Sequence, residues 1–152
     1  MRIMDFIRVD RIAADMQAAD KESALRELAD LLGAQAGVDR TAVLSAWIER
    51  ERLASTGIGD GVAIPHGKLR TASGLVAAMG RSRRGVEFAS MDGRPAHLFF
   101  ALVAPENSAG LHLKALARIS RLLKDADFRA RLLEAEGAID LFQIVGEEDA
   151  KY

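Results

Sequence analysis

The residue types best suited to chemistry in this chain stand at the end of one glycine-rich stretch, in Ile64-Pro65-His66-Gly67. Pro65 restricts its own φ and stiffens the backbone before His66, whereas Gly67 lets backbone or a bound group approach closely. A neutral imidazole is a competent nucleophile near pH 7, because its unperturbed pKa of about 6.5 leaves most of it unprotonated. The pattern is typical of a histidine that reacts at the surface, but it also fits a loop histidine held by a hydrogen bond.

A phosphoryl group is one substrate that such a histidine would suit. Its transfer requires an in-line nucleophile and positive charge around the equatorial oxygens, with little covalent help from the protein. The candidate cations are Arg50 and Arg52, at the end of a predicted helix, and Lys68 beside the motif. The glycine loop offers unhindered N–H groups that can surround an anion. The residues assigned to phosphate binding are Ser55, Thr56, Gly57, Gly59 and Gly67.

Of the two remaining histidines, one is a candidate site residue and the other is not. His112 stands where a helix is expected to open, so its side chain can project toward a site at the strand ends, where ligands gather in α/β sheets. The competing interpretation of His112 is a structural histidine near a helix N-terminus. His97 lies on the approach to a predicted strand and is interpreted as structural or exposed.

Several other chemistries fail on spacing or composition. Gly57, Gly59 and Gly61 do not make the dinucleotide-binding pattern G-x-G-x-x-G, and they precede a strand instead of following one. The segment from Gly61 to Lys68 is one residue too long for a P-loop, and Leu69 replaces its Ser or Thr. The chain has no cysteine and only three, widely separated histidines. We therefore expect no thiol chemistry, no metal centre and no cofactor.

Composition indicates one ordinary globular domain, because the 152 residues are 49% hydrophobic and 28% charged. The net charge of −1 lacks the basic excess of a dedicated nucleic-acid binder. Charges interrupt Met1–Arg8 before a signal-peptide apolar region can form. No uncharged apolar run approaches the roughly 18 residues that cross a bilayer. We expect a cytoplasmic protein that binds no nucleic acid and does not insert into a membrane.

Two helices are expected before the glycine-rich motif. The spacing of apolar residues predicts an amphipathic helix over Lys21–Gly37, ended by Gly33 or Gly37. A second helix is expected after Asp39, its N-cap, and closes on the charged residues Glu49–Arg52.

Strands and further helices are expected after the motif. The short apolar runs Val62–Ile64, Leu75–Met79 and Leu98–Val103 read as strands, and their near-continuous hydrophobicity indicates a sheet covered by helices on both faces. The segment Arg81–Gly85 is expected to be a solvated strand end and turn. Three helices are expected in the last third, one after His112, one capped by Asp125 and one around Ile139–Phe142. The predicted fold class is α/β, in a single domain.

The segment Leu53–Leu69 resembles the phosphohistidine motif of the mannitol/fructose-type IIA domains of the bacterial phosphotransferase system, in wording most similar to the nitrogen-regulatory branch. The resemblance covers about residues 5–145 and implies a mixed β-sheet flanked by helices on both faces. It implies that His66 accepts a phosphoryl group on Nε2 from a small histidine phosphocarrier protein (HPr-like), that Arg50 neutralises the phosphoryl oxygens, and that His112 is the second histidine of the site. Lys114 departs from some nitrogen-branch members, which carry another histidine there.

Two functional classes are compatible with the resemblance. The first is a regulator, whose phosphorylation state informs target proteins about nitrogen, carbon or potassium status. The second is a sugar-transport IIA component that passes its phosphoryl group to a IIB domain during fructose- or mannitol-type uptake. The chain ends at Glu147–Tyr152 without an attached IIB or membrane domain, which together with the motif favours the regulator. A signalling module that has lost phosphorylation is disfavoured, because His66 and Arg50 are both present.

Overall fold

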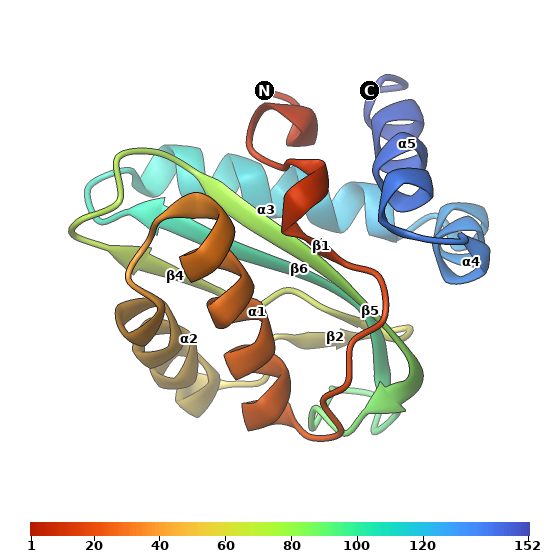
Figure 1. The fold of residues 1–152 in the computed structure, drawn as a ribbon, viewed down its shortest axis with the longest axis horizontal. Coiled ribbons are helices and arrows are strands. Elements are labelled where there is room, and N and C mark those ends of the chain that lie inside the picture. Colours follow the sequence, from red (N-terminus) through yellow and green to blue (C-terminus); the bar gives the residue numbers. More distant parts are fainter.

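A mixed six-stranded sheet with helices on both faces forms the frame of the molecule (Figure 1). The computed structural model describes residues 1–152, with the exception of the side chain of Ala109. The strands run in the order β1-β5-β6-β3-β2, and β4 also pairs with β6. The elements are the 3₁₀ turns η1 (Ile3–Asp5) and η2 (Val9–Arg11), the strands β1 (Ile12–Ala13), β2 (Gly57–Gly59), β3 (Val62–Ala63), β4 (His66–Leu69), β5 (Val76–Val86) and β6 (Ala96–Pro105), and the helices α1 (Lys21–Ala36), α2 (Arg40–Leu53), α3 (Ala109–Leu123), α4 (Ala126–Glu134) and α5 (Ala138–Asp149).

Aspartate side chains start three of the helices. Asp20, Asp39 and Asp125 accept hydrogen bonds from first-turn N–H groups of α1, α2 and α4, which satisfies donors that the helix itself cannot pair. The N-caps predicted at Asp39 and Asp125 are thereby confirmed. At its other end α1 stops before Gly37, which has a φ of 69°, so Gly37 and not Gly33 ends the helix.

The antiparallel pair β5 and β6 forms the centre of the sheet, and both of its faces are buried. The strands predicted at Leu75–Met79 and Leu98–Val103 lie almost entirely within β5 and β6. Helices α1 and α2 cover one face, while α3, α4 and α5 cover the other (Figure 1). Each face therefore needs apolar residues, which removes the polar alternation of a half-exposed strand. Along β6 the side chains of Leu98, Phe100 and Leu102 face α3–α5, and those of Phe99, Ala101 and Val103 face α1 and α2.

The prediction of a solvated turn at Arg81–Gly85 is wrong for its first two residues. Strand β5 continues to Val86, and both Arg81 and Ser82 are completely buried. The polar residue types of this segment predicted exposure to solvent. A polar side chain can nevertheless be buried when distant parts of the chain supply its hydrogen-bond partners. Arg83 and Arg84 are exposed, as expected.

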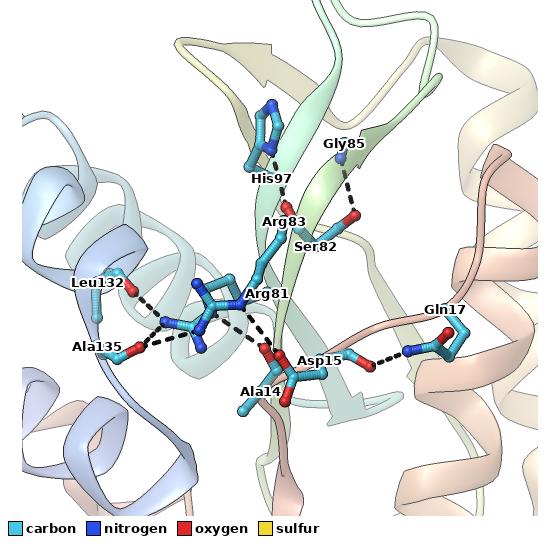
Figure 2. A network of polar contacts seen from close by, with 10 residues as sticks. All are labelled: Ala14, Asp15, Gln17, Arg81, Ser82, Arg83, Gly85, His97, Leu132 and Ala135. Atoms are coloured by element: carbon cyan, nitrogen blue, oxygen red, sulfur yellow. Dashed lines mark hydrogen bonds and ion pairs between the residues drawn. The ribbon is translucent and has the colours of Figure 1, made fainter.

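Arg81 is held by backbone carbonyl groups from distant parts of the chain (Figure 2). Its Nε donates to the oxygen of Ala14 at 3.1 Å, and its Nη1 donates to Leu132 at 2.9 Å and also to Ala135. Leu132 and Ala135 lie at the C-terminal end of α4, where unpaired carbonyls carry partial negative charge. Arg81 thus ties the chain after β1, the sheet and α4 together. In the same view, Nδ1 of His97 lies 2.8 Å from the Ser82 carbonyl, which gives His97 a structural role.

Strands β3 and β4 both pair with the edge of β6 that faces away from β5, and Pro65 lies between them. β3 pairs with residues 98–99 of β6 and β4 with residues 102–105, in both cases in parallel. This arrangement places His66 at the start of an edge strand. Within the described chain, none of the helices combines the length and hydropathy that a membrane span requires.

Candidate active site

The backbone of His66 is held between β6 and α2. The carbonyl of Pro65 accepts a hydrogen bond from the Leu102 N–H at 2.8 Å, and His66 lies opposite Leu102 in the parallel register. A Cβ on Gly67 would lie 3.1 Å from the Cβ of Ala46 in α2, a tight contact that would push β4 and the helix apart by a few tenths of an ångström. Gly67 therefore favours close packing of β4 on α2, which brings His66 close to that helix.

Both ring nitrogens of His66 have partners, and the partners define the tautomer. Nδ1 lies 2.8 Å from the carbonyl oxygen of Ile64, and a carbonyl can only accept, so Nδ1 carries the proton. Nε2 then holds the lone pair, and it accepts a hydrogen bond from Nε of Arg50 at 3.2 Å. The ring therefore presents one nucleophilic nitrogen, next to a guanidinium group.

Arg50 reaches this nitrogen from the last turn of α2. Its Nη1 donates to the carbonyl of Ala54, the residue just beyond the helix, at 2.8 Å. A guanidinium has five N–H donors in a fixed fork, so these two bonds orient its plane and leave other donors for a ligand. Carboxylate and phosphoryl oxygens are the ligands that such a planar fork can bind through two N–H groups at once.

The electrostatic surroundings keep His66 neutral. Burial of the ring is the main cause that lowers the pKa of His66 below its ordinary 6.5, and the positive charge of Arg50 acts in the same direction. The hydrogen bond to Ile64 and the carboxylate of Glu51 oppose this shift, because both favour the protonated ring. The balance leaves the Nε2 lone pair free at pH 7, as a nucleophile requires.

His112 lies in the first turn of α3 with its ring beside that of His66. The two ring centroids are 5.3 Å apart, and only 6% of His112 is exposed. Burial, with added repulsion from the charges of His66 and Lys68, lowers the pKa of His112 to about 4. Its Nδ1 atom is buried and has no hydrogen-bond partner among the described residues. His112 is therefore a neutral ring with unused hydrogen-bonding capacity next to His66.

Four of the five loop residues assigned to phosphate binding make contacts within the fold, and the assignment itself stays a prediction. The N–H of Thr56 donates to Glu51 at 2.9 Å, and that of Gly57 donates to the Ser55 hydroxyl at 3.0 Å. A Cβ on Gly59 would lie 3.3 Å from a carboxylate oxygen of Asp92, a neighbour that repels anions. These contacts give Ser55, Thr56, Gly57 and Gly59 a structural role, and the geometry lends no support to anion binding there.

Of the cations named from the sequence, only Arg50 contacts His66. Arg52 and Lys68 are exposed, and Lys68 acts on the site through its charge near His112. Lys114 is also exposed, and it is the ring of His112 that lies beside that of His66, tilted by 56°. Within the described residues, no three histidine or acidic side chains gather in a way that could hold a metal ion.

Sequence reasoning missed Glu51, whose side chain is only 6% exposed. Its neighbours Glu49 and Arg52 are exposed, and nothing in the run of charges at the end of α2 distinguishes Glu51 from them. The only available signal was Thr56, a hydroxyl five residues later that can reach back to a carboxylate.

This combination of a neutral histidine, an arginine sixteen residues earlier and a second buried histidine can be compared with known proteins. The family model described as "Phosphoenolpyruvate-dependent sugar phosphotransferase system, EIIA 2" matches residues 5–148. The chain belongs to this EIIA family. EIIA domains are phosphoryl-transfer components of that system. The family and the mixed-sheet fold implied by the motif are thereby confirmed.

Individual EIIA relatives fall into two functional branches. A nitrogen regulatory protein of Bradyrhizobium diazoefficiens is 39% identical over 95% of both chains. A fructose-specific EIIABC component of Bacillus subtilis is 37% identical over 98% of this chain, which spans only 24% of that protein. The crystal structure of the nitrogen regulatory protein IIA-Ntr from Neisseria meningitidis superposes with a TM-score of 0.88, at 31% identity, over 94% of this chain and 98% of that one.

Proposed function

We propose that this chain is a phosphohistidine carrier, in which Nε2 of His66 accepts a phosphoryl group from a small histidine phosphocarrier protein of the HPr type. The observation that carries the proposal is the pair of hydrogen bonds on the His66 ring. The Ile64 carbonyl accepts a hydrogen bond from Nδ1–H, and Nε of Arg50 donates one to Nε2. Only Nε2 is left with a lone pair, so the site has one defined nucleophilic atom.

In the proposed transfer, the Nε2 lone pair of His66 forms an N–P bond while the N–P bond to the donor histidine breaks and its electron pair returns to the donor ring. The group in flight carries negative charge on three equatorial oxygens. Arg50 loses Nε2 as an acceptor at this moment, and its N–H groups turn to these oxygens. The positive charge that develops on the His66 ring is stabilised by the Ile64 carbonyl at Nδ1.

His112 is proposed as the second group that receives the phosphoryl oxygens. Its ring is neutral at pH 7, so it does not repel the Arg50 guanidinium, and a neutral imidazole can still donate one N–H. Because Nδ1 is enclosed by the protein, the N–H that faces the phosphoryl group belongs to Nε2. Arg50, His66 and His112 together form the proposed catalytic set.

We further propose that the chain acts in the cytoplasm as a regulator, whose phosphorylation state is read by target proteins. The match to a nitrogen regulatory protein over 95% of both chains supports this role. The second candidate, supported by the 37% identity to a fructose-specific EIIABC component, is transfer of the phosphoryl group to a IIB domain.

Incubation with a phosphorylated HPr-type carrier tests the acceptor, and intact-protein mass spectrometry reads the result. The wild type should gain one acid-labile phosphoryl group, and His66→Ala should gain none while keeping its circular dichroism spectrum. A His66→Ala variant that is still phosphorylated would remove His66 as the acceptor. The phosphorylated protein is then mixed with a fructose-type IIB domain. A regulator should retain its phosphoryl group, whereas a transport component should transfer it to the IIB domain.

A further inference from the structure

We infer that Glu51 is a positioning residue for phosphoryl transfer, because its buried carboxylate holds the backbone segment on which both Arg50 and His66 depend. This inference rests on the proposed function of His66 as the phosphoryl acceptor. Glu51 itself touches neither reacting nitrogen, so its effect must pass through its partners.

The Glu51 carboxylate is fully engaged in the interior. It accepts hydrogen bonds from the Thr56 N–H at 2.9 Å and from the Thr56 hydroxyl. Its other oxygen lies 2.9 Å from Nζ of Lys21, the first residue of α1. A buried carboxylate is stable only when it is paired and hydrogen-bonded, and these three donors meet that condition. Glu51 therefore fixes Thr56, which is only 3% exposed.

One chain of hydrogen bonds and one short stretch of backbone connect Thr56 to the reacting groups. The Thr56 carbonyl accepts the N–H of Ile64 at 2.9 Å, and the Ile64 carbonyl accepts Nδ1–H of His66 at 2.8 Å. Two residues before Thr56, the carbonyl of Ala54 accepts Nη1 of Arg50 at 2.8 Å. One carboxylate thus sets the positions of the group that selects the His66 tautomer and the group that orients the Arg50 plane.

The pairing with Lys21 removes an electrostatic conflict. Glu51 follows Arg50 directly in the chain, and an unpaired carboxylate there would repel an incoming phosphoryl dianion. The Lys21 ammonium group cancels this charge, and it is itself held 5.0 Å above the Phe88 ring. Lys21 accordingly belongs with Glu51 and Thr56 to the group of residues that positions Arg50 and His66, although it lies far from His66 in the sequence.

The test measures single-turnover phosphorylation by a phosphorylated HPr-type carrier at increasing carrier concentration. Glu51→Ala should lower the maximal rate about 10- to 100-fold, the cost of a small misplacement of reacting groups. The half-saturating carrier concentration should not change, because Glu51 is buried and its replacement leaves the exposed side chains around His66 in place. In ¹⁵N NMR spectra, the His66 ring of Glu51→Ala should show a mixture of tautomers, whereas the wild type shows Nδ1–H alone.

Two further variants separate hydrogen bonding from charge and from folding. The double variant Lys21→Met with Glu51→Gln keeps an acceptor for Thr56 without either charge, and it should recover most of the lost rate. The double variant also provides a second test if Glu51→Ala does not fold. Adding Thr56→Val to the double variant removes the hydroxyl contact with residue 51. This addition should again slow phosphoryl transfer and give a mixture of His66 tautomers. Glu49→Ala, an exposed glutamate on the other side of Arg50, is the matched control and should behave as the wild type.

The outcomes distinguish this inference from the proposed function. A folded Glu51→Ala, or Thr56→Val in the double-variant background, with the wild-type rate and a single His66 tautomer would overturn the positioning role. A wild type that is not phosphorylated on His66 would overturn the proposed function instead, and the tautomer measurement would still decide whether Glu51 orders the His66 ring.

Discussion

Nε of Arg50 donates a hydrogen bond to Nε2 of His66 at 3.2 Å, across sixteen residues of sequence. A guanidinium has only donors and stays charged, so the nitrogen that it faces must hold a lone pair. The contact therefore leaves Nε2 as the nucleophilic nitrogen of the ring and places beside it the cation that the proposed phosphoryl transfer needs. In that proposed transfer, formation of an N–P bond breaks this contact and frees the Arg50 N–H for the phosphoryl oxygens.

Replacing Arg50 should slow phosphorylation without removing the acceptor. Arg50→Ala removes the positive charge from the transition state, and we expect a loss of about 10- to 10³-fold in rate, by analogy with lost transition-state donors in other enzymes. Arg50→Lys should recover only part of the rate, since an ammonium group keeps the charge but not the planar fork. Rapid-quench phosphorylation measures all three proteins.

The neighbouring arginine provides the control for this experiment. Arg52 is exposed on the same helix, and Arg52→Ala should phosphorylate at the wild-type rate. Equal rates for the wild type and Arg50→Ala would show that the hydrogen bond to His66 has no part in the transfer. A loss of rate confined to Arg52→Ala would show that Arg52, and not Arg50, contacts the phosphoryl group.

The titration of His66 should respond to the charge of Arg50. Burial and Arg50 both lower the pKa of His66 from 6.5, so the wild-type ring should titrate below that value. In Arg50→Met the repulsion is absent, and the midpoint should move upward, toward 6.5. A ¹⁵N NMR titration of ring-labelled protein measures both midpoints. Unchanged midpoints would mean that Arg50 does not lie near His66 in solution.

His112 should make the stability of the protein depend on pH in a defined window. Its pKa falls from 6.5 to about 4 in the folded state, so between these values the unfolded chain binds the proton and the folded chain does not. Stability is therefore complete above pH 6.5 and is lost as the pH falls toward 4, by about 3 kcal/mol from this group. His66 acts with the same sign, because its pKa is also lowered.

Urea unfolding at several pH values measures this effect, with His112→Phe as the comparison. The variant lacks the titrating ring, so its free energy of unfolding should fall less than that of the wild type between pH 6.5 and 4. The carboxylates of Asp20, Asp92 and Asp125 have pKa values lowered from 3.8, so their loss of stability lies at still lower pH. Parallel pH curves for the two proteins would contradict the burial of a neutral His112.

His112 should also contribute to transfer as a hydrogen-bond donor. His112→Gln retains an N–H group near the phosphoryl oxygens, whereas His112→Leu fills similar space without one. We expect His112→Leu to lose about 10- to 100-fold in the rate of phosphorylation and His112→Gln to lose clearly less. Equal losses in the two variants would reduce His112 to a packing partner of the His66 ring.

Arg81 should matter for stability and not for transfer. Arg81→Met removes the hydrogen bonds that Arg81 donates to the carbonyls of Ala14, Leu132 and Ala135, and we expect a loss of about 2–4 kcal/mol in the free energy of unfolding. The exposed Arg84→Met is the control, with an expected change within about 0.5 kcal/mol. A folded Arg81→Met should still be phosphorylated on His66. A change below 0.5 kcal/mol would show that the three hydrogen bonds add nothing to the fold.

Local features of the sequence were sufficient for most elements and for singling out His66 as the proposed acceptor. The N-caps at Asp39 and Asp125 and the end of α1 at Gly37 depend on backbone groups only a few residues away, so short-range chemistry decides them. Strand β6 and the first part of β5 are buried on both faces, which makes them continuous apolar runs that are visible in the sequence alone. The motif around His66 is equally local, because Pro65 and Gly67 act on adjacent backbone.

The tertiary structure alone decided which polar side chains are buried and what they contact. Arg81 looked like part of a solvated turn, yet it is enclosed because carbonyls of residues 14, 132 and 135 converge on it. Short β1 is invisible in the sequence, since its two residues become a strand only by pairing with β5. In the sequence Glu51 is one of several charged residues at the end of α2, and only its contacts with Lys21 and Thr56 distinguish it from them. The desolvation cost of each group is met by partners distant in sequence, and only the folded chain brings those partners within hydrogen-bond distance.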